Sequence, residues 1–155
     1  MSLMDCSSEH LVRISFFPGK NMKRKGCSII FINDNQQVLL FLRDNIPTIP
    51  FPNMWDVPGG HVDPGETPEA CIIREMKEEM ELELMDFSLF SIMEFPDRIE
   101  YTFWKRSNLD IQQITLHEGQ CLRWFDQKEV EKTELALGFN EILQSFFAQS
   151  PFLKS

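Results

Sequence analysis

The feature that most constrains this chain is a run of acidic residues near its middle. Between Asp63 and Asp86 there are nine Asp and Glu residues against Arg74 and Lys77, a local balance of −7 within a net charge of −9 for all 155 residues. Like charges at this density disfavour a short helix, because neighbouring side chains repel one another. The run therefore predicts a cation among its side chains, and a hard divalent ion bound through oxygen ligands suits that place.

The acidic run contains the start of a helix. Thr67 has the side chain of an N-cap residue, and Pro68 fits the first helical position. The local pattern predicts a helix from Pro68 to about Met80.

Helical geometry places three of the carboxylates together. On a wheel of 100° per residue, Glu75, Glu78 and Glu79 share an arc of about 100°. An apolar stripe beside this arc is expected to pack on a sheet, and it consists of Ile73, Met76 and Met80. Three carboxylates on one rigid face predict a site for Mg²⁺ or Mn²⁺.

The loop before this helix is rich in glycine and proline. Pro58-Gly59-Gly60 and Asp63-Pro64-Gly65 supply glycines where the backbone must turn sharply or approach a metal or phosphate closely. Paired glycines alone are weak evidence for a site. Joined to the carboxylate spacing, they become strong evidence.

The remaining segments predict strands, helices and one long ordered loop. The expected strands are His10–Phe17, Gly26–Ile32, Val38–Leu42, Met85–Phe95, Ile99–Lys105 and Gln120–Phe125, of which the second and third form a hairpin. Further helices are expected at Lys128–Glu134 and Phe139–Ala148. Three prolines exclude regular structure from Asn45–Asn53. This order predicts a mixed sheet covered by helices on both faces.

The composition predicts one globular domain over residues 1–155. Hydrophobic residues make up 43% and aromatic residues 12%, which is enough for a proper core. No apolar stretch is long enough to predict a membrane span, and the N-terminus lacks the pattern of a secretory signal. The acidic balance argues against a nucleic-acid polymer as partner, because no basic stripe is present to replace its counterions.

The four cysteines predict free thiols and no zinc site. They are scattered without a CxxC pair, at Cys6, Cys27, Cys71 and Cys121. The last three lie in apolar runs, which is typical of buried thiols in a reducing compartment. We therefore expect a cytoplasmic location.

The glycine, arginine and carboxylate pattern resembles a known signature. Gly60-x5-Glu66-x7-Arg74-Glu75-Met76-Lys77-Glu78-Glu79-x2-Leu82 resembles the Nudix box of the Nudix hydrolase family. It departs from the box at one position, where the family has glycine near the helix end and this chain has Glu81. A residue other than glycine in a left-handed helix exit costs about 1 kcal/mol, so the departure affects how the helix ends and not the carboxylates. Trp55-Asp56-Val57-Pro58 also resembles the strand that leads into the box.

The resemblance implies a fold, a reaction and a cofactor. The implied fold is an α/β/α sandwich with a mixed β-sheet between helices, and the implied reaction is hydrolysis of a nucleoside diphosphate linked to another group, with Mg²⁺ or Mn²⁺. The implied metal ligands are Glu75, Glu78, Glu79 and the carbonyl oxygen of Gly59. Glu66 and Arg74 would orient the carboxylates. The partner would be a small nucleotide, and many family members are homodimers.

Three further residues have a functional and an ordinary interpretation. Glu118, in a segment similar to MutT-type members, is a candidate general base beside Glu75, or a solvated turn residue. Asn140 resembles the asparagine with which MutT-type members read a purine base, or it caps the last helix. Arg43 at a strand end could contact phosphate, or it is a surface arginine.

The favoured substrate is a nucleoside triphosphate, cleaved to monophosphate and pyrophosphate. Nucleotide sugars and dinucleoside polyphosphates are the alternative substrates of the same fold. The alternative to an enzyme is a Nudix-like regulatory domain that binds nucleotides and has no catalytic activity. Such a domain is expected to have lost its metal carboxylates, whereas Glu75, Glu78 and Glu79 are all present here.

Overall fold

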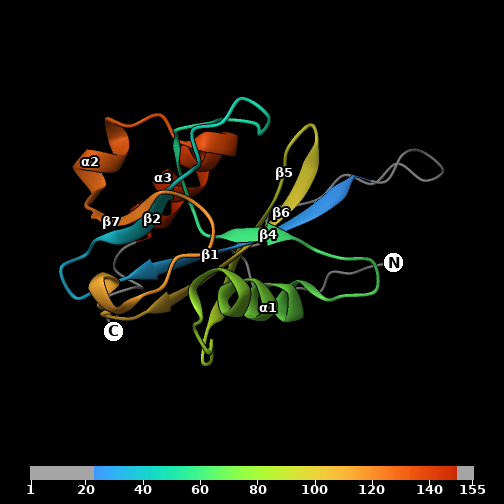
Figure 1. Ribbon diagram of the computed structural model, residues 1–155, viewed down its shortest axis with the longest axis horizontal. Helices are drawn as coiled ribbons and strands as arrows, with labels where there is room; N and C mark the ends of the chain where they lie inside the picture. Colours follow the sequence, from blue (N-terminus) through green and yellow to red (C-terminus); the bar gives the residue numbers. More distant parts are fainter. Residues whose placement is uncertain (1–22, 150–155) are drawn as a thin grey trace.

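The computed structural model describes residues 23–149 and shows one mixed β-sheet between helices (Figure 1). The strands are β1 Arg24–Ile32, β2 Val38–Leu42, β3 Trp55–Asp56, β4 Gly59–His61, β5 Ser88–Glu94, β6 Arg98–Arg106 and β7 Cys121–Phe125. The helices are α1 Pro68–Met80, α2 Gln127–Glu131 and α3 Phe139–Ala148, with single 3₁₀ turns at Ile111–Gln113 and Ala136–Gly138.

The sheet follows the order β3-β2-β1-β6-β5, with β4 paired to β1 and β7 paired to β2. The long strands β1 and β6 run parallel over their whole length, while the other pairs are antiparallel. The predicted mixed sheet is therefore confirmed. Parallel neighbours need a long crossover connection, and here that connection contains α1, which carries the acidic run.

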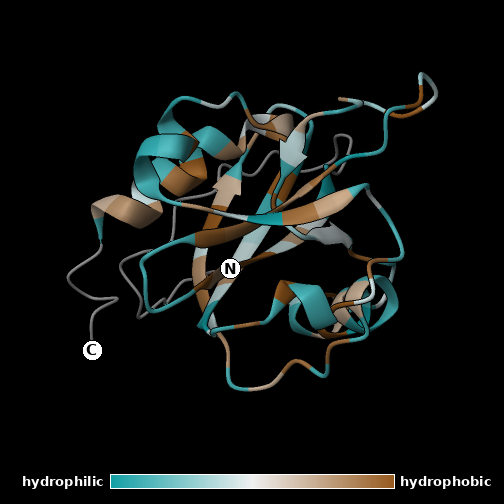
Figure 2. Ribbon diagram, turned by 60° about the vertical axis from the view of Figure 1, so that its left-hand side comes forward, coloured by the Kyte–Doolittle hydropathy of each residue, from teal (hydrophilic) through white to brown (hydrophobic). Residues whose placement is uncertain are grey.

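The core lies in two layers because side chains of a strand alternate between its faces. From the central strand β1, Cys27, Ile29 and Phe31 pack on the side of α1, while Ile30 and Ile32 pack on the side of α2 and α3. Figure 2 shows this arrangement as hydrophobic strands between helices whose outer faces are hydrophilic. Strand β1 is buried on both faces, as its continuous apolar run predicts.

Most of the helices and strands agree with the sequence, with three corrections. The apolar stripe of α1 uses Ile72, which is fully buried, while Ile73 is 42% exposed. The face of α1 that packs on the sheet is therefore closer to the carboxylates than the predicted stripe of Ile73, Met76 and Met80. Helix α2 ends at Glu131 and not at Glu134, and the short strand β4 was not predicted. The predicted strand at His10–Phe17 lies outside the described residues.

The prediction of buried free thiols is wrong for three of the cysteines. Cys27 on β1 and Cys71 on α1 are joined in a disulfide across 44 residues of chain, and Cys121 is a free but exposed thiol. The two bonded residues meet only when α1 packs on the sheet, which explains why their spacing gave no signal. Cys6 lies outside the described residues.

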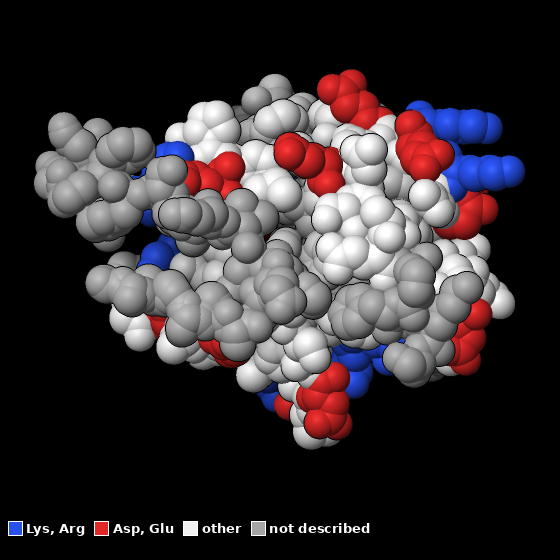
Figure 3. Space-filling model, turned by 180° about the vertical axis from the view of Figure 1, so that it is seen from behind, with Lys and Arg blue, Asp and Glu red and all other residues white. Residues whose placement is uncertain are grey.

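The face of the molecule opposite to the view of Figure 1 carries both acidic and basic side chains. On the face seen from behind in Figure 3, acidic and basic side chains form small separate groups, and no basic band crosses its described part. Within residues 23–149 there is no helix with the length and apolarity needed to cross a membrane.

Candidate functional site

Local sequence fixes where α1 begins and ends. The Thr67 side chain accepts a hydrogen bond from the Ala70 N–H, as expected of an N-cap. The helix ends at Glu81, which adopts the left-handed conformation with φ of 55°. The exit that glycine favours therefore forms here with a glutamate, at an intrinsic cost of about 1 kcal/mol.

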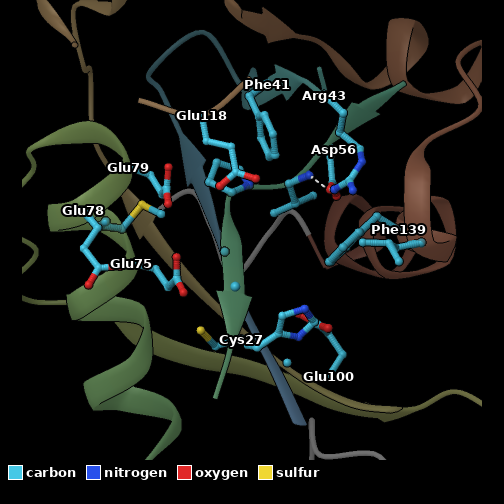
Figure 4. Close-up of a pocket in the computed structure, with 18 of the residues that line it drawn as sticks. Cys27, Phe41, Arg43, Asp56, Glu75, Glu78, Glu79, Glu100, Glu118 and Phe139 are labelled. Carbon is cyan, nitrogen blue, oxygen red and sulfur yellow. Dashed lines mark hydrogen bonds and ion pairs between the residues drawn. The ribbon is translucent and has the colours of Figure 1, made fainter. Parts of the chain in front are cut away.

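Helix α1 presents a cluster of three carboxylates. Glu75, Glu78 and Glu79 each offer an oxygen atom within 4.8 Å of those of the other two. Figure 4 shows the three side chains on one side of the pocket, all from α1. The structure thus brings together the residues that helical geometry placed on one face, and oxygen ligands at this spacing suit a hard divalent cation.

One arginine organises the base of this cluster. Arg74 Nε donates to Glu66 Oε2 at 2.7 Å and its Nη2 to Glu66 Oε1 at 3.0 Å, while Nη1 lies 3.2 Å from both Glu75 Oε2 and Glu78 Oε1. The Arg74 guanidinium, helped by the Asp63 N–H, lowers the pKa of Glu66 to about 2. Glu66 therefore remains charged and fixes the planar fork of Arg74, which in turn orients two carboxylates of the cluster.

Two glycines allow the helix to lie this close to the sheet. A Cβ atom on Gly60 would fall 2.1 Å from Cδ of Glu75, and one on Gly59 would fall 2.0 Å from the carbonyl oxygen of Cys27. Any side chain at Gly60 would push Glu75 out of its position. The paired glycines are therefore required by close approach of β4 to both α1 and β1.

Glu118 lies in the same pocket as the cluster, although it comes from the loop before β7. That loop is held to the end of α1, because the His117 N–H donates to the Glu79 carbonyl at 2.8 Å and the His117 ring lies 2.6 Å from Glu81. In Figure 4, Glu118 and Glu79 point into a common space. Glu118 is exposed in a bend, as the solvated-turn interpretation expects, so its role as a general base stays a prediction.

The carboxylates crowd one another. Burial, reinforced by the neighbouring Glu118 carboxyl, raises the pKa of Glu79 to about 7. Burial also raises the pKa of Glu75, with the charges of Glu78 and Glu118 adding to it and Arg74 opposing it. A cluster in which carboxylates compete for protons has the donor chemistry to hold a divalent cation, because the cation would relieve their repulsion.

The cluster opens into a pocket of about 640 Å³ that extends across β4. We define its far end by six lining residues that lie away from α1: Arg43, Asp56, Arg98, Glu100, Leu137 and Phe139. Figure 4 shows the labelled members of this set on the other side of β4 from the α1 carboxylates. A pocket of this size is typical of a small-molecule site.

At the far end, the buried Asp56 pairs with Arg43, which is half-buried. Arg43 Nη1 donates to Asp56 Oδ2 at 2.9 Å, and its Nη2 donates to the Pro50 carbonyl at 2.8 Å. Asp56 also accepts from the Val57 N–H at 2.8 Å. Burial raises the pKa of Asp56 to about 6, while Arg43 opposes the shift. Arg43 thus ties the proline-rich loop to β3, and a phosphate contact by it stays a prediction.

Asn140 does not line the pocket and has no contact with the carboxylate cluster, whereas Glu66 and Arg74, which also lie outside the lining, are hydrogen-bonded to each other and to the cluster. Its Oδ1 accepts from the Leu135 N–H at 2.8 Å, and its Nδ2 donates to the Thr133 carbonyl at 2.7 Å. The N-cap of α3 is Gly138, so the capping interpretation is wrong. Asn140 fastens the loop before α3, and contact with a base stays a prediction that this placement does not favour.

Sequence reasoning missed the Arg98–Glu100 pair. Arg98 Nε donates to Glu100 Oε1 at 2.7 Å, and both side chains are buried. The available signal was two opposite charges separated by one residue in a strand, hence on one face. Such a pattern is typical of the solvent-exposed face of a strand, so it did not predict a buried pair.

Comparison with known proteins identifies relatives. A family model described as the NUDIX domain matches residues 22–146. The putative 8-oxo-dGTP diphosphatase of Bacillus subtilis (strain 168) is 43% identical over 58 residues, 37% of this chain and 35% of that protein. The 8-oxo-dGTP diphosphatase of Escherichia coli (strain K12) is 37% identical over 78 residues, 48% of this chain and 59% of that protein. The match therefore spans less than two thirds of either relative.

Solved structures share the fold at low sequence identity. The MutT protein from Methanosarcina mazei Go1 has a TM-score of 0.67 at 20% identity, covering 83% of this chain and 95% of that one. The NUDIX domain of Shewanella oneidensis NrtR complexed with ADP ribose has a TM-score of 0.68 at 15% identity, covering 86% and 93%. These likenesses show the α/β/α sandwich that the sequence predicted.

Proposed function

This chain belongs to the Nudix family, and on that premise we propose that it hydrolyses a nucleoside triphosphate to monophosphate and pyrophosphate with a divalent metal ion. The observation that carries the proposal is the cluster of Glu75, Glu78 and Glu79, whose oxygens lie within 4.8 Å of one another at the mouth of a nucleotide-sized pocket. Phosphate groups need cations beside them, and this end of the pocket is acidic, so a bound metal must supply the positive charge.

The proposed ligands are the three α1 carboxylates and the carbonyl oxygen of Gly59. We propose Mg²⁺, or alternatively Mn²⁺, which when bound polarises phosphoryl oxygens and acidifies water. Arg74 and Glu66 hold the ligands in place through the bidentate contact described above. Restricting the carboxylates in this way lowers the cost of organising them for each turnover.

The general base is proposed to be Glu118 or Glu75. Both lie in the pocket beside the cluster, and both are carboxyls that can accept a proton from an attacking water. Glu118 belongs to a loop that is anchored to α1, so its side chain has a defined position relative to Glu79. The two candidates can be separated by substitution, since loss of the true base should abolish the acidic limb of the pH–rate profile, whereas loss of the other carboxyl should only shift it.

We favour a triphosphate over the other substrates because of two relatives. The relatives named 8-oxo-dGTP diphosphatase act on a nucleoside triphosphate, which supports this choice. Another relative is an RNA pyrophosphohydrolase from a Nitratiruptor species, 29% identical over 90 residues. The net charge of −9 speaks against a nucleic-acid polymer here.

Location and assembly also remain proposals. We propose a cytoplasmic enzyme because its substrate class is found there, although the Cys27–Cys71 disulfide counts against a reducing compartment. A homodimer is compatible with the family. The proposal of a single domain over residues 1–155 rests on the family match to residues 22–146.

The experiment that tests the function is a product assay with and without Mg²⁺. The panel contains the deoxynucleoside triphosphates, 8-oxo-dGTP, a nucleotide sugar, ADP-ribose, a dinucleoside polyphosphate and a 5′-triphosphorylated RNA. Metal-dependent release of pyrophosphate from a triphosphate is the expected result. Monophosphate without pyrophosphate from another substrate would replace the triphosphate. Nucleotide binding without turnover of any substrate would favour a regulatory domain.

A further inference from the structure

The far end of the pocket contains a polar strip where the sheet should be apolar. On the α3 side of β1 the alternating positions are Gly26, Ser28, Ile30 and Ile32, and the last two belong to the core. Gly26 pairs with Glu100 on β6, and Ser28 pairs with Thr102. Half of this face therefore carries a carboxyl and two hydroxyls. Aliphatic side chains at these positions would fold without the free-energy cost of burying polar groups.

The carboxyl of Glu100 is held in a fixed orientation. Arg98 Nε donates to its Oε1 at 2.7 Å, and Arg98 is itself anchored to the Leu137 carbonyl at 2.8 Å and lies 4.2 Å over the Phe95 ring. A Cβ atom on Gly26 would come within 2.5 Å of Glu100 Oε1, so the carboxyl occupies space that only glycine leaves open. Arg98 therefore acts as a positioning residue for Glu100.

Glu100 keeps hydrogen-bonding capacity toward the pocket. A carboxylate has about four acceptor sites, and Arg98 Nε and the Ser28 hydroxyl use two of them. Burial raises the pKa of Glu100, and Arg98 and a hydrogen bond from Ser28 oppose that shift. Asp56 differs, because Arg43 and the Val57 N–H engage both of its oxygens.

We infer that Glu100 determines base specificity by accepting hydrogen bonds from the donor-rich edge of a guanine-type base. This inference rests on the proposed function. Guanine presents N1–H and N2–H₂ side by side, which match the two oxygens of one carboxylate. Adenine presents an acceptor, N1, beside its N6 amine, and that acceptor would face the carboxylate lone pairs. Phe139 and Leu137 give the base an apolar wall to pack on.

The test measures base selectivity in two ways. The kcat/KM values for dGTP, dITP, which lacks the 2-amino group, and dATP are compared in the wild type and in Glu100→Gln. The wild type should prefer dGTP over dITP and dITP over dATP. In the variant the dGTP value should fall about 10-fold or more, the range of a lost bidentate contact, while the dATP value stays within about threefold.

Binding of the monophosphates dGMP and dAMP, followed by calorimetry, separates this inference from the proposed function. Tighter binding of dGMP by the wild type, lost in Glu100→Gln, supports the inference even if no triphosphate is hydrolysed. Glu141→Gln, an exposed change on α3, is the matched control and should keep the wild-type preference.

Two results would overturn the inference. One is a wild type that prefers an adenine or pyrimidine nucleotide, a result that does not depend on how the variant folds. The other is a folded Glu100→Gln variant whose ratio of dGTP to dATP is unchanged, because Glu100 would then be a structural partner of Arg98 only.

Discussion

At the α1 end of the pocket one arginine is shared among four carboxylates, whereas at the far end each buried carboxyl has an arginine of its own. Arg74 lies within 3.5 Å of Asp63, Glu66, Glu75 and Glu78, and Glu79 and Glu118 add further negative charge. At the far end, Arg43 pairs with Asp56 and Arg98 with Glu100.

This difference shows how one residue type can serve two tasks. A surplus of carboxylates is stable only with a cation among them, so the α1 end is suited to a metal and to phosphates. Balanced pairs carry no net charge, and they are suited to an uncharged base that is recognised through hydrogen bonds. The following predictions, from the largest expected effect to the smallest, test this division of the pocket.

Loss of one carboxylate at the α1 end should have the largest effect on activity. We expect Glu79→Gln to lower kcat by roughly 10²–10³-fold, because an amide is a poor ligand for a hard cation. The thermal midpoint should rise or stay constant, since the change removes a charge from a crowded cluster. Steady-state kinetics and calorimetry measure the two effects.

The matched control is Glu69→Gln, an exposed substitution in the first turn of α1. It should leave kcat within about twofold. Equal activity of Glu79→Gln and the wild type would refute the assignment of this end to metal.

Loss of the Glu66 carboxylate, which holds Arg74 in place, should have an intermediate effect on activity. Glu66→Gln removes the charged partner that fixes the guanidinium, and we expect a loss of roughly 10- to 100-fold in activity, as is typical of groups that orient metal ligands. The Mg²⁺ concentration for half-maximal rate should increase. If kcat fell with no change in the metal requirement, Glu66 would have a role apart from ligand orientation.

The far-end pairs should make stability depend on pH. The pKa of Asp56 is about 6 in the folded protein and near 3.8 when unfolded. The folded state therefore binds its proton more tightly, and this group's contribution to stability falls as pH rises from about 4 to about 6. We expect Asp56→Asn to remove that fall, which is on the order of 3 kcal/mol.

Chemical denaturation at several pH values between 4 and 7 measures this effect. The exposed change Asp86→Asn serves as the control. An unchanged pH profile in Asp56→Asn would show that burial at the far end does not disfavour charge as the structure indicates.

A substitution at Glu81, where α1 ends, should have the smallest effect, and it should act mainly on stability. Glu81→Gly relieves a left-handed residue and removes the ion pair with His117, which is solvent-exposed and contributes little. We expect a net stabilisation of about 0.5–1 kcal/mol. If the pair also positions the Glu118 loop, kcat should fall by about twofold, and His117→Gln should reproduce that fall without the stabilisation.

What could be predicted from sequence is the part of the site that local geometry controls. The start of α1 follows from the side chains of Thr67 and Pro68, and the cluster follows from helical spacing between Glu75, Glu78 and Glu79. The same reasoning misplaced Ile73, because the choice between two neighbouring apolar stripes depends on where the sheet lies. Glu118 was recognised by resemblance alone, and no local rule connects it to α1.

The sequence by itself determined the order of strands and helices and the spacing of the carboxylates on α1, because these depend on residues a few positions apart. The tertiary structure alone decided the far end of the pocket and the Cys27–Cys71 bond. Parallel pairing of β1 with β6 brings Gly26 beside Glu100, 74 positions away. The hydrophobic pattern of each strand restricts the register to pairings that keep the same face buried, and packing of the whole core selects one of them.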